Sequence, residues 1–292
     1  MDGSQINFDD VIQDSELQPP HDFIDVIKSD TLKGAHIYAQ GFLQWHLWSS
    51  MAVAEIRRRY RRTLFGPFWL TLSIAIFIGS MGLIFPILWH TDVKTFLPFF
   101  SSGFIIWTFI STIITDGCGT FLDASGLIKQ TSLPYSVYSN SAVTRNFLVI
   151  LHHFVFYLAI VLLFKVPVNL NTLLIIPAMM IIGLTGSWVC ILLGLMTARF
   201  RDIRQFVTSL LQIAMFITPV FWSPTQLGNA TYAKILVAVN PLYHFVEIAR
   251  APLLGLKPAP IDWIVTMGIC IVGWLVSMKI LGKFQRHLVF WL

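Results

Sequence analysis

Six long segments of this sequence carry almost no charge, and they constrain the possible folds more than any other feature. They cover residues 68–89, 96–115, 146–164, 173–196, 206–222 and 263–281. Within them only Lys279 is charged, and it lies near the end of the last segment. Spanning the hydrocarbon core of a bilayer takes about 20 apolar residues of helix. The sequence therefore predicts an all-α membrane protein with six transmembrane helices.

The composition supports a membrane protein and excludes soluble classes. Hydrophobic residues make up 55% of the chain and charged residues only 12%, whereas a soluble domain carries about 25% charged residues. Three cysteines, Cys118, Cys190 and Cys270, lie far apart. This spacing provides neither a disulfide framework nor a zinc site.

Lysine and arginine are distributed unevenly between the loops of this layout. With the N-terminus inside, the inside segments hold 15 of these residues and the outside segments hold 5. Cytoplasmic loops of membrane proteins carry an excess of Lys and Arg. We therefore expect both termini to be cytosolic.

The part before the first span divides into two. Residues 1–41 form an acidic, partly disordered cytosolic extension, because eight of the fifteen acidic residues lie in the first 30 positions. Residues 42–66 form an amphipathic helix that ends in five arginines within six positions: Arg57, Arg58, Arg59, Arg61 and Arg62. Its Trp and Tyr residues recur at helical steps, and a basic helix with an aromatic edge lies in the membrane–water interface.

A shorter apolar piece, residues 235–246, precedes the last span and is interrupted by Asn240-Pro241. A piece of this length is re-entrant or interfacial. Broken helices at membrane depth are tolerated where they are buried in protein or line a cavity. We therefore expect a broken, re-entrant gate hairpin between helices 5 and 6, with Glu247 paired to Arg250 three residues later. A hairpin that only packs is the alternative.

Four motifs carry a resemblance to a known family. They are RRRYRRTLFGPFWLTLS at the first span, IKQTSLPYSVY after the second, ARFRDI after the fourth and NPLYHFVEIAR before the last. In this order they resemble the membrane subunit of ABC-2 type exporters, in the branch that exports O-antigens, capsules and teichoic acids. The resemblance covers about residues 45–285 and makes residues 67–292 the transmembrane domain. The acidic extension is not part of the common pattern.

The resemblance implies a half-transporter. A second copy of the chain and two ATP-binding cassette subunits would complete an exporter of lipid-linked polysaccharide in the bacterial inner (cytoplasmic) membrane. This chain would bind no cofactor, and ATP and Mg²⁺ would bind the partner subunits. The turn after the second span would dock on the ATPase subunit, through Phe121, Leu122, Ile128 and Lys129. The arginine run would either gather the diphosphate of the substrate or only anchor the helix to membrane lipids.

A path for sugar is expected to use aromatic rings, which make up 14% of the chain. The candidates lie in the second span and around the fifth span and the hairpin: Phe100, Phe104, Trp107, Phe216, Trp222 and Tyr243. Serines and threonines in the second span indicate a face that is not exposed to lipid, or hydrogen bonds between helices.

The sequence offers no chemistry of its own. It contains no GxxxxGK[ST] loop and no GxSxG motif, so ATP must be hydrolysed by a separate subunit. His152 and His153 are adjacent, whereas a zinc pair on a helix would be four residues apart. The arginine run directly precedes a membrane span, which argues against nucleic acid as a partner. An ABC-2 exporter of a lipid or drug, a membrane-embedded glycosyl- or acyltransferase, and a passive channel are the alternatives.

Overall fold

The computed structural model describes residues 23–62, 66, 68–224, 235 and 237–292, with side chains from residue 29 onward. These residues form helices and turns only. The elements are α2 (Phe23–Leu43), α3 (Trp45–Tyr60), α4 (Phe68–Trp89), α5 (Val93–Gly119), α6 (Ser125–Gln130), α7 (Tyr135–Phe164), η1 (Leu170–Leu174), α8 (Ile175–Arg199), α9 (Ile203–Ile217), α11 (Pro241–Leu253) and α12 (Pro260–Trp291). The predicted all-α class is confirmed for this part of the chain.

Within the described residues, five helical stretches are long and apolar enough to cross a membrane. They are Phe68–Trp89, Val93–Gly119, Tyr135–Phe164, Leu170–Arg199 and Pro260–Trp291. Each contains one of the predicted spans, so the sequence located five long apolar helices correctly. Several extend well beyond the predicted apolar core, because polar residues at their ends are helical as well.

The remaining predicted span, 206–222, corresponds to the shorter helix α9. This helix has 15 residues and is about 22 Å long, below the roughly 30 Å of a hydrocarbon core. The chain leaves the helix at Ile217, and residues 218–223 are not helical. The count of six spans therefore stays a prediction.

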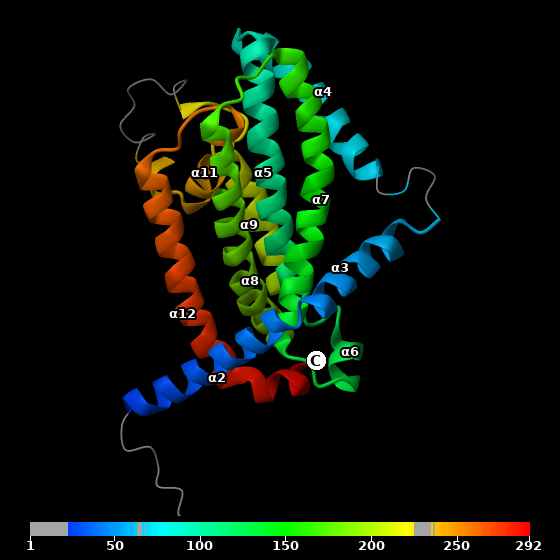
Figure 1. Ribbon diagram of the computed structural model, residues 1–292, viewed down its shortest axis with the longest axis vertical. Coiled ribbons are helices and arrows are strands. Elements are labelled where there is room, and N and C mark those ends of the chain that lie inside the picture. The colour runs from blue at the N-terminus through cyan, green and yellow to red at the C-terminus, as the bar shows by residue number, and fades with distance from the viewer. Residues whose placement is uncertain (1–22, 63–65, 67, 225–234, 236) are drawn as a thin grey trace, which may run out of the picture.

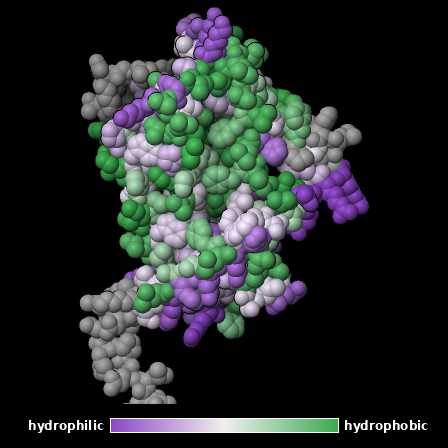
Figure 2. All heavy atoms as spheres, in the orientation of Figure 1, coloured by the Kyte–Doolittle hydropathy of each residue, from purple (hydrophilic) through white to green (hydrophobic). Residues whose placement is uncertain are grey.

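The long helices form a bundle, and α2 and α3 lie across one of its ends (Figure 1). We call this the basic end, defined by α2, α3, α6 and the last turns of α12. Both ends of the described chain lie at the basic end (Figure 1). Figure 2 shows apolar side chains over the middle of the face in view and hydrophilic ones toward both ends, including the basic end. That the basic end faces the cytosol stays a prediction.

Helix α5 is the centre of the bundle. The most apolar 18-residue stretch of α5 is 61% buried, whereas the same stretch in each of the other four long helices is 22–44% buried. It packs against α4, α7, α8, α9 and α11. Its buried residues include Phe100, Ile105, Ile106 and Trp107, and the bundle core forms around them. Helix α5 therefore contacts most of the other helices of the bundle.

The extension contains a feature that the sequence analysis missed, the helix α2. It crosses the last turns of α12 so closely that a Cβ at Gly34 would meet the backbone of Met278, and a Cβ at Gly282 would meet the backbone of Asp30. Tyr38 is 2% exposed and hydrogen-bonds Ser277. Burial raises the pKa of Tyr38, which keeps its hydroxyl protonated. The two helices also share an apolar cluster that includes Ile37 and Leu281, but their closest approach is at glycines, which hydropathy does not detect.

The segment after α9 ends in helix α11, and Asn240-Pro241 forms the start of that helix. The Asn240 side chain caps it by accepting from the N–H of Leu242 at 3.0 Å, and Pro241 occupies the first turn. Residues 235 and 237–239 are helical as well. The first arm of the predicted hairpin lies mostly outside the described residues, so the hairpin itself stays a prediction.

Candidate functional site

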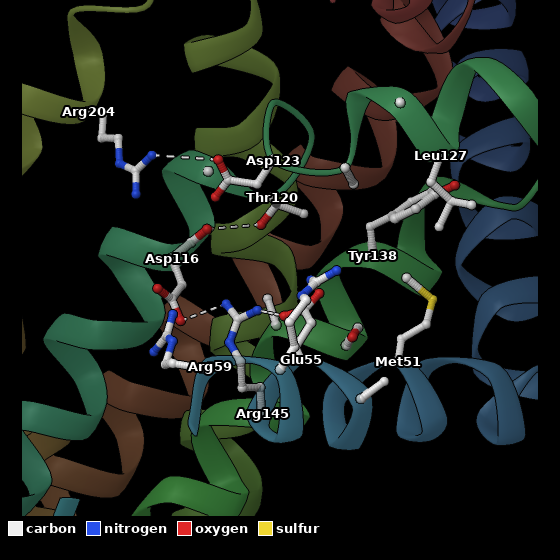
Figure 3. A pocket seen from close by; sticks show the side chains of 17 residues that line it. Met51, Glu55, Arg59, Asp116, Thr120, Asp123, Leu127, Tyr138, Arg145 and Arg204 are labelled. Carbon is white, nitrogen blue, oxygen red and sulfur yellow. Dashed lines mark hydrogen bonds and ion pairs between the residues drawn. The ribbon is translucent and has the colours of Figure 1, made fainter. Parts of the chain in front are cut away.

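A cavity of about 680 Å³ opens at the basic end. Its walls come from α3, the last turn of α5, the turn that carries α6, the start of α7, and Arg204 at the start of α9. Figure 3 shows Glu55, Asp116, Asp123, Arg145 and Arg204 gathered around it. Since the walls come from segments far apart in the sequence, any movement of α3 or of the α6 turn changes the shape of the cavity.

Arg145 is the ionic centre of this cavity. Its guanidinium pairs with Glu55 of α3 and donates to Oδ2 of Asp116 on α5 at 2.7 Å. Asn146 donates to the same oxygen at 2.9 Å. The side chains of Arg145, Asp116 and Glu55 are 15%, 17% and 29% exposed. Arg145 thus joins three helices, and each partly buried charge depends on the others for compensation.

The predicted arginine run divides between the cavity and the open surface. Arg58 and Arg59 line the cavity, whereas Arg57, Arg61 and Arg62 do not. All five are exposed, and within the described residues none forms an ion pair. A separate ion pair, between Arg204 and Asp123 at 3.7 Å, is exposed and lies on the other side of the cavity. The cavity therefore offers guanidinium groups with free donors to an anionic ligand.

The predicted sugar-path aromatics lie in different surroundings. Phe100 is fully buried and Trp107 is 3% exposed, so both belong to the core, whereas Phe216 is 67% exposed. Phe104 and Phe216 are linked to Phe100 through Phe221, with ring centroids 5.4–6.3 Å apart. Trp222 donates to the Phe216 carbonyl at 3.1 Å. Tyr243 lies apart from this ring cluster, next to His244 on α11.

The residues predicted to couple to an ATPase occupy the turn between α5 and α7. Phe121 is fully buried and Ile128 is 6% exposed, both in an apolar cluster with α2 and the end of α12. Leu122 is half-buried and Lys129 is exposed. Phe121 and Ile128 therefore hold the turn in place, and the surface of the turn is made by residues such as Lys129.

The predicted gate residues meet at the opposite end of the bundle. Arg250 is 1% exposed, pairs with Glu247, and donates to the Pro219 carbonyl at 2.5 Å. Its guanidinium lies 4.3 Å from the ring centroid of Phe99 on α5. Asn240 donates to Oγ1 of Thr218 at 2.9 Å. Arg250 and Asn240 thus connect α11 to the segment after α9 and to α5.

Sequence reasoning missed the residues that organise the basic end, Glu55, Asp116 and Arg145. Asp116 and Arg145 directly adjoin the second and third apolar segments, and an ionisable residue at such a position is a functional candidate by default. That signal was present, but their mutual pairing required the fold. Among the described residues, no group of three or more His, Cys, Asp or Glu side chains is arranged to hold a metal ion.

The fold and the site define a multi-pass membrane protein with a basic cavity at one end. At the other end lies a buried ionic latch, the name we give to Arg250 with its partners Glu247 and the Pro219 carbonyl. Residues 46–254 match the family described as "ABC-2 type transporter". The chain belongs to the ABC-2 type transporter family, which confirms the resemblance. The family makes this chain a membrane subunit of a transporter and not its catalytic part.

Two curated relatives carry the same name. The chain is 24% identical over 206 residues to the "O-antigen export system permease protein RfbA" of Myxococcus xanthus, which covers 69% of this chain and 78% of the relative. It is 21% identical over 239 residues to a protein of that name from Klebsiella pneumoniae, which covers 80% of this chain and 92% of the relative.

Proposed function

We propose that this chain is the transmembrane subunit of an ATP-driven exporter that moves a lipid-linked polysaccharide, an O-antigen, to the outer face of the bacterial inner membrane. The observation that carries the proposal is the cavity at the basic end, where Arg58 and Arg59 offer unpaired guanidinium groups. A lipid-linked polymer presents a diphosphate, and guanidinium groups bind phosphate oxygens in bidentate geometry. The names of the bacterial relatives support the same substrate.

We place the rest of the assembly on surfaces that a single copy leaves open. Helix α9 has no buried residue among its 15 positions, and Phe206, Leu210, Ile213 and Phe216 are exposed along one side. A second copy facing α9 would cover this stripe and enclose the half-exposed hydroxyls of α5 in a shared path. Two ATP-binding cassette subunits would dock below, on the exposed surface of the α6 turn. ATP and Mg²⁺ would be held by those subunits.

The alternatives differ in what they require of the site. An exporter of a lipid or drug needs the same ATPase but no contact with sugar. A glycosyl- or acyltransferase needs clustered acidic or histidine side chains, and the acids at the basic end are engaged by Arg145 and Arg204. A passive channel needs no ATPase at all.

Copurification tests the proposed function. The chain, coexpressed with an ATP-binding cassette subunit from the same organism, is expected to purify as a complex of two copies of each subunit with measurable ATPase activity. In cells, deletion of the chain is expected to leave polymer in the cytosol, as detected by surface labelling before and after permeabilisation. If export continues without an ATPase partner, the passive channel is favoured. If polymer still reaches the surface in cells that lack this chain, the polymer is not its substrate.

The phosphate role of the arginine run gives a prediction of its own. The triple change Arg57→Ala, Arg58→Ala and Arg59→Ala is expected to lower surface polymer by about tenfold or more, because charge-assisted hydrogen bonds contribute about 1.5–3 kcal/mol each. The protein should still insert, and polymer should accumulate inside. Surface labelling and membrane fractionation measure the two effects.

Two controls separate phosphate binding from anchoring. Three exposed cations that do not line the cavity, Lys279, Lys283 and Arg286, can be changed together to Ala with little expected loss of export. Replacing Arg57, Arg58 and Arg59 by Lys keeps the charge but removes the bidentate fork. Normal export in the alanine variant would reject the phosphate role, and full activity in the lysine variant would show that charge alone suffices.

A further inference from the structure

A second cavity of about 400 Å³ adjoins the first. It lies between α4, α5 and α7, and it shares Arg59, Asp116 and Arg145 with the cavity at the basic end. A group bound at Arg59 therefore lies at the boundary between the two cavities. The rest of a ligand that is attached to this group can extend into the second cavity.

One side of this second cavity is aromatic. Trp69 and Phe77 of α4 and Phe104 of α5 line it. The rings of Phe77 and Phe104 stack with centroids 4.5 Å apart and planes at 22°. Aromatic faces of this kind offer an apolar platform to a ligand that has a flat or apolar face.

The hydroxyl groups in the cavity are oriented as hydrogen-bond acceptors. Thr108 and Thr112 of α5 donate to the carbonyls of Phe104 and Thr108, at 2.8 and 2.6 Å, and Ser73 of α4 donates to the Trp69 carbonyl at 2.8 Å. Since each hydroxyl proton is used within its own helix, the oxygen lone pairs remain to accept from a ligand. A ligand that matches them carries donors.

His153 supplies an unsatisfied group in the same wall. It lies two helical turns from Arg145, on the side of α7 that lines the cavity, and is 5% exposed. Within the described part of the chain its Nδ1 has no hydrogen-bond partner. The preceding residue differs, because Nδ1 of His152 lies 2.7 Å from the Leu148 carbonyl. Buried polar atoms are normally satisfied, so His153 points to a partner that the chain alone does not provide.

We infer that this second cavity binds a sugar ring, the one that carries the diphosphate of the exported lipid. A sugar presents hydroxyl donors to Thr108 and Thr112, an apolar face to the aromatic wall and a hydroxyl to His153, while its diphosphate lies at Arg59. An acyl or isoprenyl chain in the same space would leave His153 and the hydroxyl oxygens without partners. The inference rests on the proposed function, since it takes the phosphate at Arg59 as its anchor.

Binding of two matched probes tests the inference on the full-length protein in lipid nanodiscs. The probes are farnesyl diphosphate and its conjugate with N-acetylglucosamine, titrated by calorimetry. The wild-type protein is expected to bind the conjugate about tenfold more tightly, the equivalent of one or two net hydrogen bonds. His153→Leu should keep its affinity for farnesyl diphosphate and lose this gain. His153→Gln, which retains a donor and an acceptor, should keep most of it, and the matched control His152→Leu should keep all of it.

Each other outcome contradicts the inference. If the wild-type protein binds both probes equally, or if His153→Leu keeps the sugar gain, the cavity does not bind sugar, although diphosphate binding and the proposed function stand. Tighter binding of farnesyl diphosphate by His153→Leu would assign the cavity to an apolar chain. Binding of neither probe would reject both the inference and the phosphate role. Size-exclusion profiles identify a variant that has failed to fold, and His153→Gln then decides.

Discussion

Replacing Arg145 by alanine is expected to destabilise the protein by about 3–5 kcal/mol, the range measured when one member of a buried ion pair is removed. The change leaves Asp116 and Glu55 without their counterion, at 17% and 29% exposure. It also disconnects α3 from α5 and α7 at the wall of the basic cavity. We therefore expect a lower melting temperature in detergent and loss of export.

Variants that also remove the two carboxylates distinguish the destabilisation caused by unpaired charge from the destabilisation caused by lost packing. In Arg145→Ala combined with Glu55→Gln and Asp116→Asn, no carboxylate is left unpaired, so most of the stability should return while export stays low. Arg204→Ala is the matched control, because its pair with Asp123 is 3.7 Å long and exposed, and such pairs contribute about 0–1 kcal/mol. If Arg145→Ala and Arg204→Ala melt at the same temperature, Arg145 does not organise this end.

The spans could be predicted from the sequence because the bilayer imposes one strict requirement. Each crossing helix must satisfy its backbone internally and expose apolar side chains, so the five long helices appear as uncharged runs. Helix α9 shows the limit of this reasoning. The apolar run 206–222 continues past Ile217, but the helix stops there, and the carbonyl of Pro219 is used by Arg250 instead.

The helix α2 could not be predicted by the same reasoning. Its contact with α12 depends on Gly34 and Gly282, where the absence of a side chain lets two backbones approach. Hydropathy measures the free energy of transfer to an apolar phase and does not detect such close backbone packing. Acidic residues next to it made the whole extension resemble a disordered segment.

The candidate site residues were chosen by type, and the structure shows where each of them lies. Phe121 and Ile128 were placed on a docking surface because the family resemblance implies one at this turn, but a resemblance does not say which side chains of the turn are covered, and both are buried. Phe100 and Trp107 entered the sugar path for their chemistry and lie in the core. The predicted pair of Glu247 and Arg250 forms because the two residues lie three apart on one helix, which is a local relation that the sequence can give.

Arg250→Ala is the second large effect we expect, at about 3–5 kcal/mol of destabilisation, because Arg250 is 1% exposed and its removal leaves two acceptors unpaired. These acceptors are the Glu247 carboxylate and the Pro219 carbonyl. The ring of Phe99 also loses its cation. Since Arg250 joins α11 to the segment after α9, we expect the melting temperature to fall and labelling of a cysteine introduced at Thr218 to increase.

Arg250→Lys tests whether the latch depends on charge or on the guanidinium fork. Lysine can pair with Glu247, but it cannot also donate in fixed geometry to Pro219, so an intermediate melting temperature is expected. Lys257→Ala, an exposed cation at the same end, is the matched control and should melt like the wild-type protein. If Arg250→Ala is as stable as this control while export is lost, Arg250 holds no structure together and acts on the substrate instead. If both stability and export are unchanged, the connection between α11 and α5 has no role in gating.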